Sequence, residues 1–181
     1  MLASMLALPL GRGSVRPQLP FRAVNQPGLP MYRPGLQRHH LLPCQMLKVR
    51  GLKRMLGALG TGHIGMDDFR RNGLLLPAHE ADALRIGLPL HRGPHAGYNQ
   101  MVIERVGTIE GEWSRLRDQR EGGADLAALE ALDALQKALR RELLDPACWQ
   151  ARPLNRRDPA LDFSHLDAMA EMLWGATAPA A

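Results

Sequence analysis

The chain is poor in cysteine and in aromatic side chains. Cys44 and Cys148 are its only cysteines, and they lie far apart with no Cys-x-x-Cys pair. This spacing excludes a structural zinc knuckle and argues against a disulfide framework. Aromatic residues make up 4% of the 181 residues. Leu, Ala and Met therefore supply most of the apolar content of 45%, which favours helices over a large sheet.

The opening of the chain is apolar but too short to cross a membrane. No basic residues precede the apolar run in residues 1–10, and a membrane helix takes about 20 residues. The sequence therefore predicts neither a signal peptide nor a membrane segment. It leaves open whether the protein is cytoplasmic or secreted.

Acidic residues are missing from the first third of the chain. Residues 1–60 contain nine Lys or Arg and no Asp or Glu, whereas residues 111–181 contain twelve acids and nine bases. A basic field of this kind attracts polyanions, and salt weakens the attraction. It favours nucleic acid as the partner, although a basic arm also serves solubility or contact with a membrane surface.

The sequence divides into an arm, a mixed domain and a helical extension. Residues 1–31 are rich in Gly, Pro and Arg without periodicity, which is typical of a flexible arm. Residues 32–116 alternate short apolar runs with turn residues, and residues 124–175 carry leucines at helical spacing. The predicted fold is α+β, with a small core surrounded by α-helices.

The local patterns predict individual elements. Asn72-Gly73 is a turn dipeptide, and the apolar run Leu74–Pro77 follows it directly. We expect strands at Leu41–Leu42 and Leu74–Pro77, and helices over Cys44–Leu59, over 94–116, from a cap at Asp125 to Pro146, and from a capping box at Ser164.

Four of the seven histidines lie in two short clusters. His39 and His40 are adjacent, and His91-x-x-x-His95 follows about fifty residues later, after Asn72. Clustered imidazoles are typical of metal sites. Each motif alone also fits a packed ring, a surface histidine or a simple hairpin turn. Their occurrence together and in this order favours a functional site.

These motifs resemble the AHH family of the HNH superfamily of bacterial nucleases and toxins. The resemblance covers about a third of the chain. Arg38 departs from the family pattern, which has alanine at this position. The matching stretches are His39-His40-Leu41-Leu42-Pro43, Asn72-Gly73-Leu74-Leu75-Leu76-Pro77 and Leu90-His91-Arg92-Gly93-Pro94-His95, with Tyr98-Asn99 behind them. The resemblance implies a ββα-metal core.

The resemblance also implies a role for each residue. His39, His91 and His95 would bind one divalent metal ion, which is zinc, nickel, magnesium or manganese, and leave a position open for water or phosphate. His40 would be the general base. The side-chain carbonyl of Asn72 would accept a hydrogen bond from His40 and fix its tautomer.

Two further expectations concern the surroundings of this site. Arg38, Arg71 and Arg92 are candidate phosphate contacts, and Tyr98 is expected to pack the helix against the strands. Because neighbours on a regular strand point to opposite faces, His39 and His40 can serve one site only if the strand bends or ends there.

The predicted function is that of a metal-dependent endonuclease, with DNA favoured over RNA. A bacterial toxin effector with an immunity protein as its partner fits the same resemblance. Two alternatives stay open. One is a nucleic-acid-binding or metal-binding module without hydrolytic activity. The other is a toxin-derived interaction protein that holds a partner through its acidic C-terminal helices.

Overall fold

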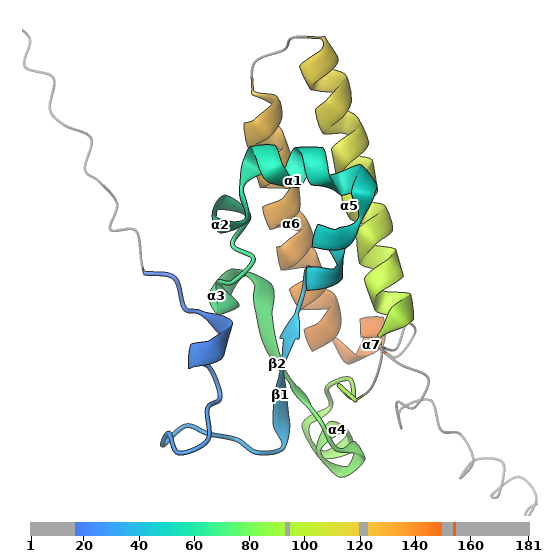
Figure 1. Ribbon diagram of the computed structural model, residues 1–181. Helices are drawn as coiled ribbons and strands as arrows, with labels where there is room; N and C mark the ends of the chain where they lie inside the picture. The colour runs from blue at the N-terminus through green and yellow to red at the C-terminus, as the bar shows by residue number, and fades with distance from the viewer. Residues whose placement is uncertain (1–16, 93–94, 120–122, 150–153, 155–181) are drawn as a thin grey trace, which may run out of the picture.

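The computed structural model describes residues 17–92, 95–119, 123–149 and 154 (Figure 1). Helices and 3-10 turns surround one small antiparallel sheet, so the fold is α+β as predicted. Strand β1 (Leu36–His40) pairs with β2 (Gly73–Pro77), with Leu36 opposite Pro77 and His40 opposite Gly73. No described helix is long and apolar enough to span a membrane.

The first strand and the Asn-Gly turn differ from their predictions. Strand β1 ends at His40, and Leu41 and Leu42 follow it as fully buried core residues outside the strand. Asn72 is the last residue of a short helix, and Gly73 is the first residue of β2. The two strands are joined by a long helical segment, so Asn72-Gly73 is not a hairpin turn.

The predicted helix over Cys44–Leu59 is broken into three pieces. Val49, a β-branched residue, adopts an extended conformation with a ψ of 117°, and Gly51 lies two residues later. Both residues disfavour a continuous helix, although the apolar residues keep their helical spacing through the segment. The three pieces are the 3-10 helices η2 (Cys44–Lys48) and η3 (Arg50–Leu52) and the helix α1 (Lys53–Leu59). Two short helices, α2 (Thr61–Ile64) and α3 (Phe69–Asn72), follow before β2.

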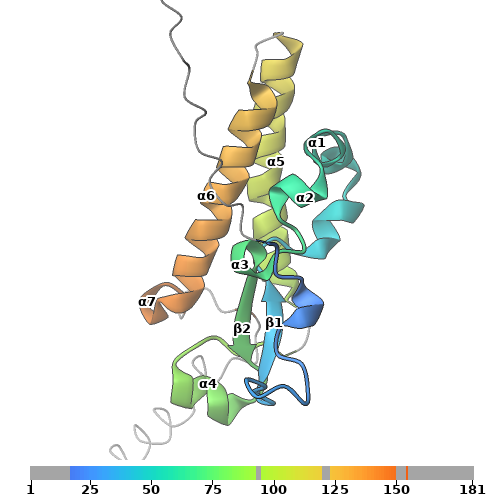
Figure 2. The same cartoon turned by 90° about the vertical axis from the view of Figure 1, so that its left-hand side faces the viewer.

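Two long helices form the other half of the molecule. Both views show α5 (Ala96–Asp118) and α6 (Ala124–Leu144) side by side, with α1 across one face of the pair (Figure 1, Figure 2). Helix α4 (Glu80–Ile86) lies at the opposite end of the strand pair from α1, and α7 (Pro146–Trp149) follows α6. The helix predicted from Ser164 falls outside the described residues.

Asp125 does not cap α6 as predicted. The N-cap is Gly123, whose φ of 93° suits glycine, and Asp125 lies in the first turn. Its Oδ1 instead accepts a hydrogen bond from Trp113 Nε1 at 2.7 Å, which ties α5 to α6. The predicted leucine stripe is also shifted: Leu126 is 61% exposed, whereas Gln136 is buried.

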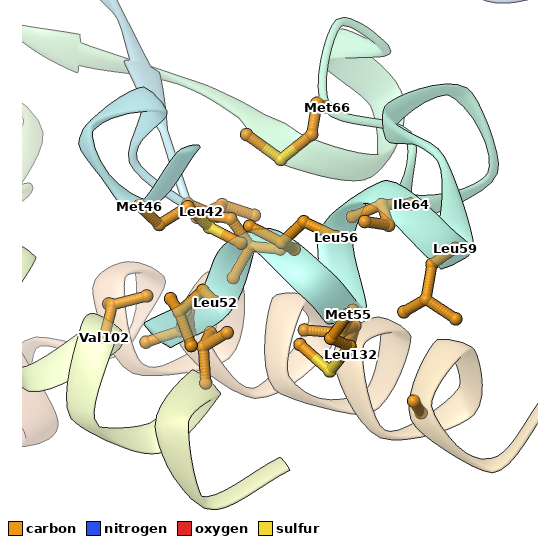
Figure 3. Close-up of a cluster of buried hydrophobic side chains, with 14 of the residues drawn as sticks. Leu42, Met46, Leu52, Met55, Leu56, Leu59, Ile64, Met66, Val102 and Leu132 are labelled. Carbon is orange, nitrogen blue, oxygen red and sulfur yellow. The ribbon is translucent and has the colours of Figure 1, made fainter. Parts of the chain in front are cut away.

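The core lies between the strand end, α1 and the α5–α6 pair. Leu42, Met46 and Met55 are fully buried, and they pack with Val102 of α5 and Leu132 of α6 (Figure 3). A two-stranded sheet is marginal on its own. Its stability here comes from this apolar cluster, which anchors the chain directly after β1.

The segment Pro17–Ala23 packs on the fold, although it belongs to the predicted flexible arm. We call these residues the N-terminal strap. Leu19 N–H donates to Asp68 Oδ1 at 3.3 Å, and Phe69 N–H donates to Leu19 O at 2.8 Å. Phe21 begins the 3-10 helix η1 (Phe21–Ala23) and is only 6% exposed. The sequence of the strap has no periodicity that would predict this packing, because one phenylalanine and a few backbone hydrogen bonds hold it.

Gly73→Ala tests the packing at the start of β2. A Cβ at Gly73 would overlap the Phe69 ring, so the substitution should destabilise the protein by about 1–3 kcal/mol. Gly57→Ala is the matched control, because nothing lies within 4 Å of a Cβ there and alanine favours the helix. Urea denaturation of both variants measures the change. Equal stability of Gly73→Ala and the wild type would contradict the packing described here.

Candidate active site

Three histidines from different elements lie together. His39 belongs to β1, His95 is the N-cap of α5, and the backbone N–H of His91 donates to Pro77 O at 2.7 Å at the end of β2. One ligand nitrogen from each lies within 4.8 Å of the others. The ring centroids of His91 and His95 are 4.4 Å apart, and that of His39 is 5.0 Å from His91. The structure thus brings the three predicted ligands together.

Two buried ring nitrogens of this histidine group have no partner in the part of the chain that the structure describes. His39 Nε2 and His95 Nδ1 are buried, and neither has a hydrogen-bond partner among the described residues. His91 Nδ1 lies 3.1 Å from Gln37 Oε1 and must donate to this oxygen, which leaves His91 Nε2 bare. A buried polar atom without a partner costs about 1–3 kcal/mol. Bare imidazole nitrogens are a donor set that suits a divalent transition metal.

Burial lowers the pKa of all three imidazoles. The pKa of His39 falls from 6.5 to about 2, first because of burial and then because of the neighbouring His91 and His95. The pKa of His91 falls to about 4, through burial and the nearby His95, and burial also lowers the pKa of His95. All three rings are therefore neutral at pH 7, which is the state that binds a metal.

His40 points to the other face of β1 and has different neighbours. Its ring stacks on Phe21, with centroids 3.7 Å apart and an interplanar angle of 2°. Both backbone groups of Phe21 are hydrogen-bonded: its N–H donates to Asp67 Oδ1 at 3.2 Å, and its carbonyl accepts from Arg38 Nη1 at 2.8 Å. Burial lowers the pKa of His40, Asp67 raises it and Arg38 lowers it. The strand ends at His40, which is the condition for both histidines to serve one site.

A family model matches residues 21–139, which is more than half of the chain. It describes the AHH family, a nuclease family of the HNH/ENDO VII superfamily with a conserved AHH motif. The chain belongs to the AHH nuclease family. Comparisons with curated proteins and with solved structures found no match. The matched range begins at Phe21, inside the strap, and extends into α6.

Arg38 stands where the AHH motif has alanine, and the structure gives it a partner. It is the residue whose guanidinium holds the strap through Phe21 O. Of the other two candidate phosphate contacts, Arg71 donates to His63 O at 2.7 Å and lies 3.6 Å from Asp133. Arg92 is exposed and directly follows His91. Arg38 and Arg71 therefore have structural partners in this AHH protein.

The predicted hydrogen bond between Asn72 and His40 is not formed among the described residues. Asn72 is fully buried, and its Oδ1 accepts from Leu42 N–H at 2.7 Å and from Gln136 Nε2 at 3.3 Å. Its Nδ2 donates to Leu42 O at 3.2 Å and to Met66 O at 3.1 Å. The carboxamide is saturated by these bonds. It fixes the chain after β1, and it acts on His40 only through the backbone.

Tyr98 packs the long helix against the strand end, as expected. Its hydroxyl donates to Leu41 O at 2.8 Å, and its ring lies 4.9 Å from that of His39. Burial raises the pKa of Tyr98, so the phenol keeps its proton and its hydrogen bond.

Three residues of the site were missed from the sequence. Gln37 orients His91, Phe21 stacks on His40, and Gln136 reaches Asn72 from α6. Gln136 could have been noticed in the sequence, since it is a polar residue within a helical run of leucines. Gln37 lies two residues before His39 and hence on the same strand face, which is a detectable pattern. Phe21 had no signal, because its contact depends on the path of the strap.

The first prediction for the site concerns pH. Native His39 stays unprotonated down to about pH 2, whereas the unfolded chain takes up this proton below pH 6.5. The unfolded state then binds more protons, so the metal-free protein should lose stability as the pH falls through 6.5, by about 1.4 kcal/mol per pH unit for this residue once the unfolded histidine is protonated. Urea denaturation of chelator-treated protein at pH 7.5, 6.0 and 5.0 measures the slope, and His39→Phe should reduce it. An unchanged slope in that variant would rule out the assignment.

The second prediction concerns Gln37. Gln37→Met removes the acceptor of His91 Nδ1–H, so His91 is no longer held with Nε2 free. Loss of such an orienting bond typically costs about 10–100-fold in metal affinity. Calorimetric titration with zinc should show this loss, and Gln37→Glu, which keeps an acceptor, should restore binding. Gln100→Met is the matched control, because Gln100 bonds only to Glu104 on the exposed face of α5 among the described residues. Wild-type affinity in Gln37→Met would show that the bond has no orienting role.

Proposed function

We propose that this AHH nuclease is a metal-dependent endonuclease that hydrolyses phosphodiester bonds, with DNA as its preferred substrate. The observation that carries the proposal is the group of three neutral imidazoles, one buried and two half-buried, in which His39 Nε2 and His95 Nδ1 have no hydrogen-bond partner among the described residues. A fourth imidazole, His40, lies on the other face of the same strand end. Structural packing alone would not favour so many unpaired ring nitrogens in one place. A metal ligand set explains them.

His39, His91 and His95 would hold the metal, each through the ring nitrogen that lacks a protein partner. A purely imidazole set favours zinc or nickel in binding, and magnesium or manganese are the other ions to test. When bound, the ion would stabilise negative charge on the phosphoryl and leaving oxygens.

His40 would act as the general base. The neutral ring takes a proton from a water molecule as the water oxygen bonds to phosphorus, and the bond from phosphorus to the leaving oxygen breaks. The lowered pKa of His40 keeps the ring unprotonated at neutral pH. Stacking on Phe21 restricts ring rotation, so that the accepting nitrogen is already in place. Asn72 would contribute by fixing the strand end.

The surface charge supports a nucleic-acid substrate. Residues 17–66, which include β1 and η2, contain no Asp or Glu. Arg92 would contact phosphate from the loop beside His91, and the positive charges of Arg38 and Arg71 would assist alongside their structural contacts. A role as a bacterial toxin effector, with an immunity protein as its partner, belongs to the same proposal and rests on the family resemblance.

Two histidine variants test the proposal by separating catalysis from metal binding. His40→Ala should lower plasmid cleavage by about 10²–10⁴-fold, because a general base contributes this much, and should keep its zinc affinity. His95→Ala should lose zinc affinity and cleavage together. Assays with plasmid and with RNA, each with magnesium, manganese, nickel, zinc or chelator, identify substrate and ion.

His79→Ala is the control, since His79 is an exposed residue before α4 and should affect neither measurement. Full cleavage by His40→Ala would remove the base assignment. Binding of DNA without cleavage under any of the metal conditions would instead support a binding module without hydrolytic activity.

A further inference from the structure

A hollow of about 260 Å³ adjoins His40 on the face of β1 away from the histidine group. Its apolar wall is formed by Leu47, Met66 and Cys44, and its polar wall includes Thr61 and Asp67. Most of the lining residues come from η2, α2 and the turn before α3, and Gln18 of the N-terminal strap and His40 of β1 complete the lining. Because His40 lines it, any group bound there lies beside the proposed base.

The charge of the hollow excludes a phosphate as its occupant. None of the residues that line it is Lys or Arg, and Asp67 contributes a carboxylate. An anionic phosphate would be repelled by this carboxylate and would find no cation to replace its water. A neutral group with an apolar face and polar edges fits better. Leu47 and Met66 offer contact area, and Thr61 and Asp67 offer hydrogen-bond acceptors.

The size of the hollow also limits the occupant. Pockets that enclose a whole drug-sized ligand typically measure about 300–1,000 Å³. At about 260 Å³ this hollow holds part of a nucleotide, such as the base with some of its sugar, and not a longer piece of strand.

Two nucleosides flank the cleaved bond, and the geometry of phosphoryl transfer indicates which of them lies next to the hollow. In an in-line displacement the attacking and leaving oxygens are on opposite sides of phosphorus. The water activated by His40 attacks from the His40 side, so the leaving oxygen departs on the far side. The nucleoside that keeps the phosphate is attached between these two positions and can turn toward His40.

We infer that the hollow is a subsite for the nucleobase of the nucleotide that retains the phosphate after cleavage. This inference rests on the proposed nuclease function, and it assigns a substrate contact to Thr61, Leu47 and Met66. The base lies against Leu47 and Met66, and its polar edge faces Thr61 and Asp67. Cleavage is therefore sensitive to a missing base on one side of the broken bond.

Oligonucleotides with a single abasic site test the inference. The wild-type protein is incubated with single-stranded DNA that carries one abasic position, and all cleavage products are resolved on a gel. End-group analysis shows which side of the bond keeps the phosphate. A 10-fold effect corresponds to about 1.4 kcal/mol, which is within what the burial of an apolar surface of this size contributes. We expect the bond whose phosphate-retaining nucleotide is abasic to be cut about 10-fold more slowly than its neighbours.

Thr61→Trp fills the hollow and should remove this discrimination. Thr61 is exposed, so the larger ring can be accommodated. The variant should cut intact DNA about 10-fold more slowly than the wild type. It should cut all bonds around the abasic site at similar rates, which gives an even ladder of bands on the gel. Leu84→Trp on α4 adds the same bulk at a position 66% exposed and should behave as wild type. If Thr61→Trp does not fold, Leu47→Ala removes the apolar wall and should reduce the discrimination instead.

An even ladder with the wild-type protein would overturn the inference, as would slowing on the leaving side or on both sides equally. Discrimination that persists in folded Thr61→Trp would place the base elsewhere. Binding can also be measured without turnover, by fluorescence anisotropy in the presence of chelator. Thr61→Trp should bind an intact short strand about 10-fold more weakly than the wild type does. Both proteins should bind a fully abasic strand with the same affinity. If the wild type cuts no nucleic acid but shows this binding difference, the hollow binds a base, whereas the nuclease proposal fails and with it the assignment to the phosphate-retaining nucleotide.

Discussion

The buried carboxamide of Asn72 is the interaction on which the geometry of the site depends. It bonds both the N–H and the carbonyl of Leu42, and it is itself held by Gln136 of α6. These bonds stop β1 at His40 and direct Leu42 into the core, where it is fully buried. Removing the carboxamide would leave several buried backbone groups unpaired, each costing about 1–3 kcal/mol. Two adjacent histidines thus stand at a fixed strand end.

The strand end separates two chemical environments that would interfere if they were mixed. His39 faces two other neutral imidazoles, whereas His40 faces Phe21, Asp67 and an open hollow. If both rings shared one face, His40 would join the other three imidazoles, and a closed set of four ligands is typical of structural and not of catalytic sites. In the proposed metal site, alternation along β1 would leave a coordination position open and would keep His40 free as a proton acceptor.

The fold class and the two long helices α5 and α6 could be predicted from the sequence, because long amphipathic helices leave a periodic pattern. The spacing of His39, His91 and His95 also indicated that these residues belong together, and the structure brings them close to one another. The strand was misplaced onto Leu41-Leu42 because buried residues after a strand look the same as residues within it. The role of Asn72 and the stack of Phe21 on His40 depend on contacts between distant segments. Local patterns carry no information on such contacts.

The rest of the fold must offset the cost of the histidine group. His39 Nε2 and His95 Nδ1 are buried without hydrogen-bond partners among the described residues, which is unfavourable. Two strands cannot supply the compensation by themselves. It comes from the apolar cluster around Leu42 and Met55 and from the Tyr98 hydroxyl, which ties α5 to the strand end. The histidine group therefore depends on a helical scaffold that is much larger than the sheet carrying His39.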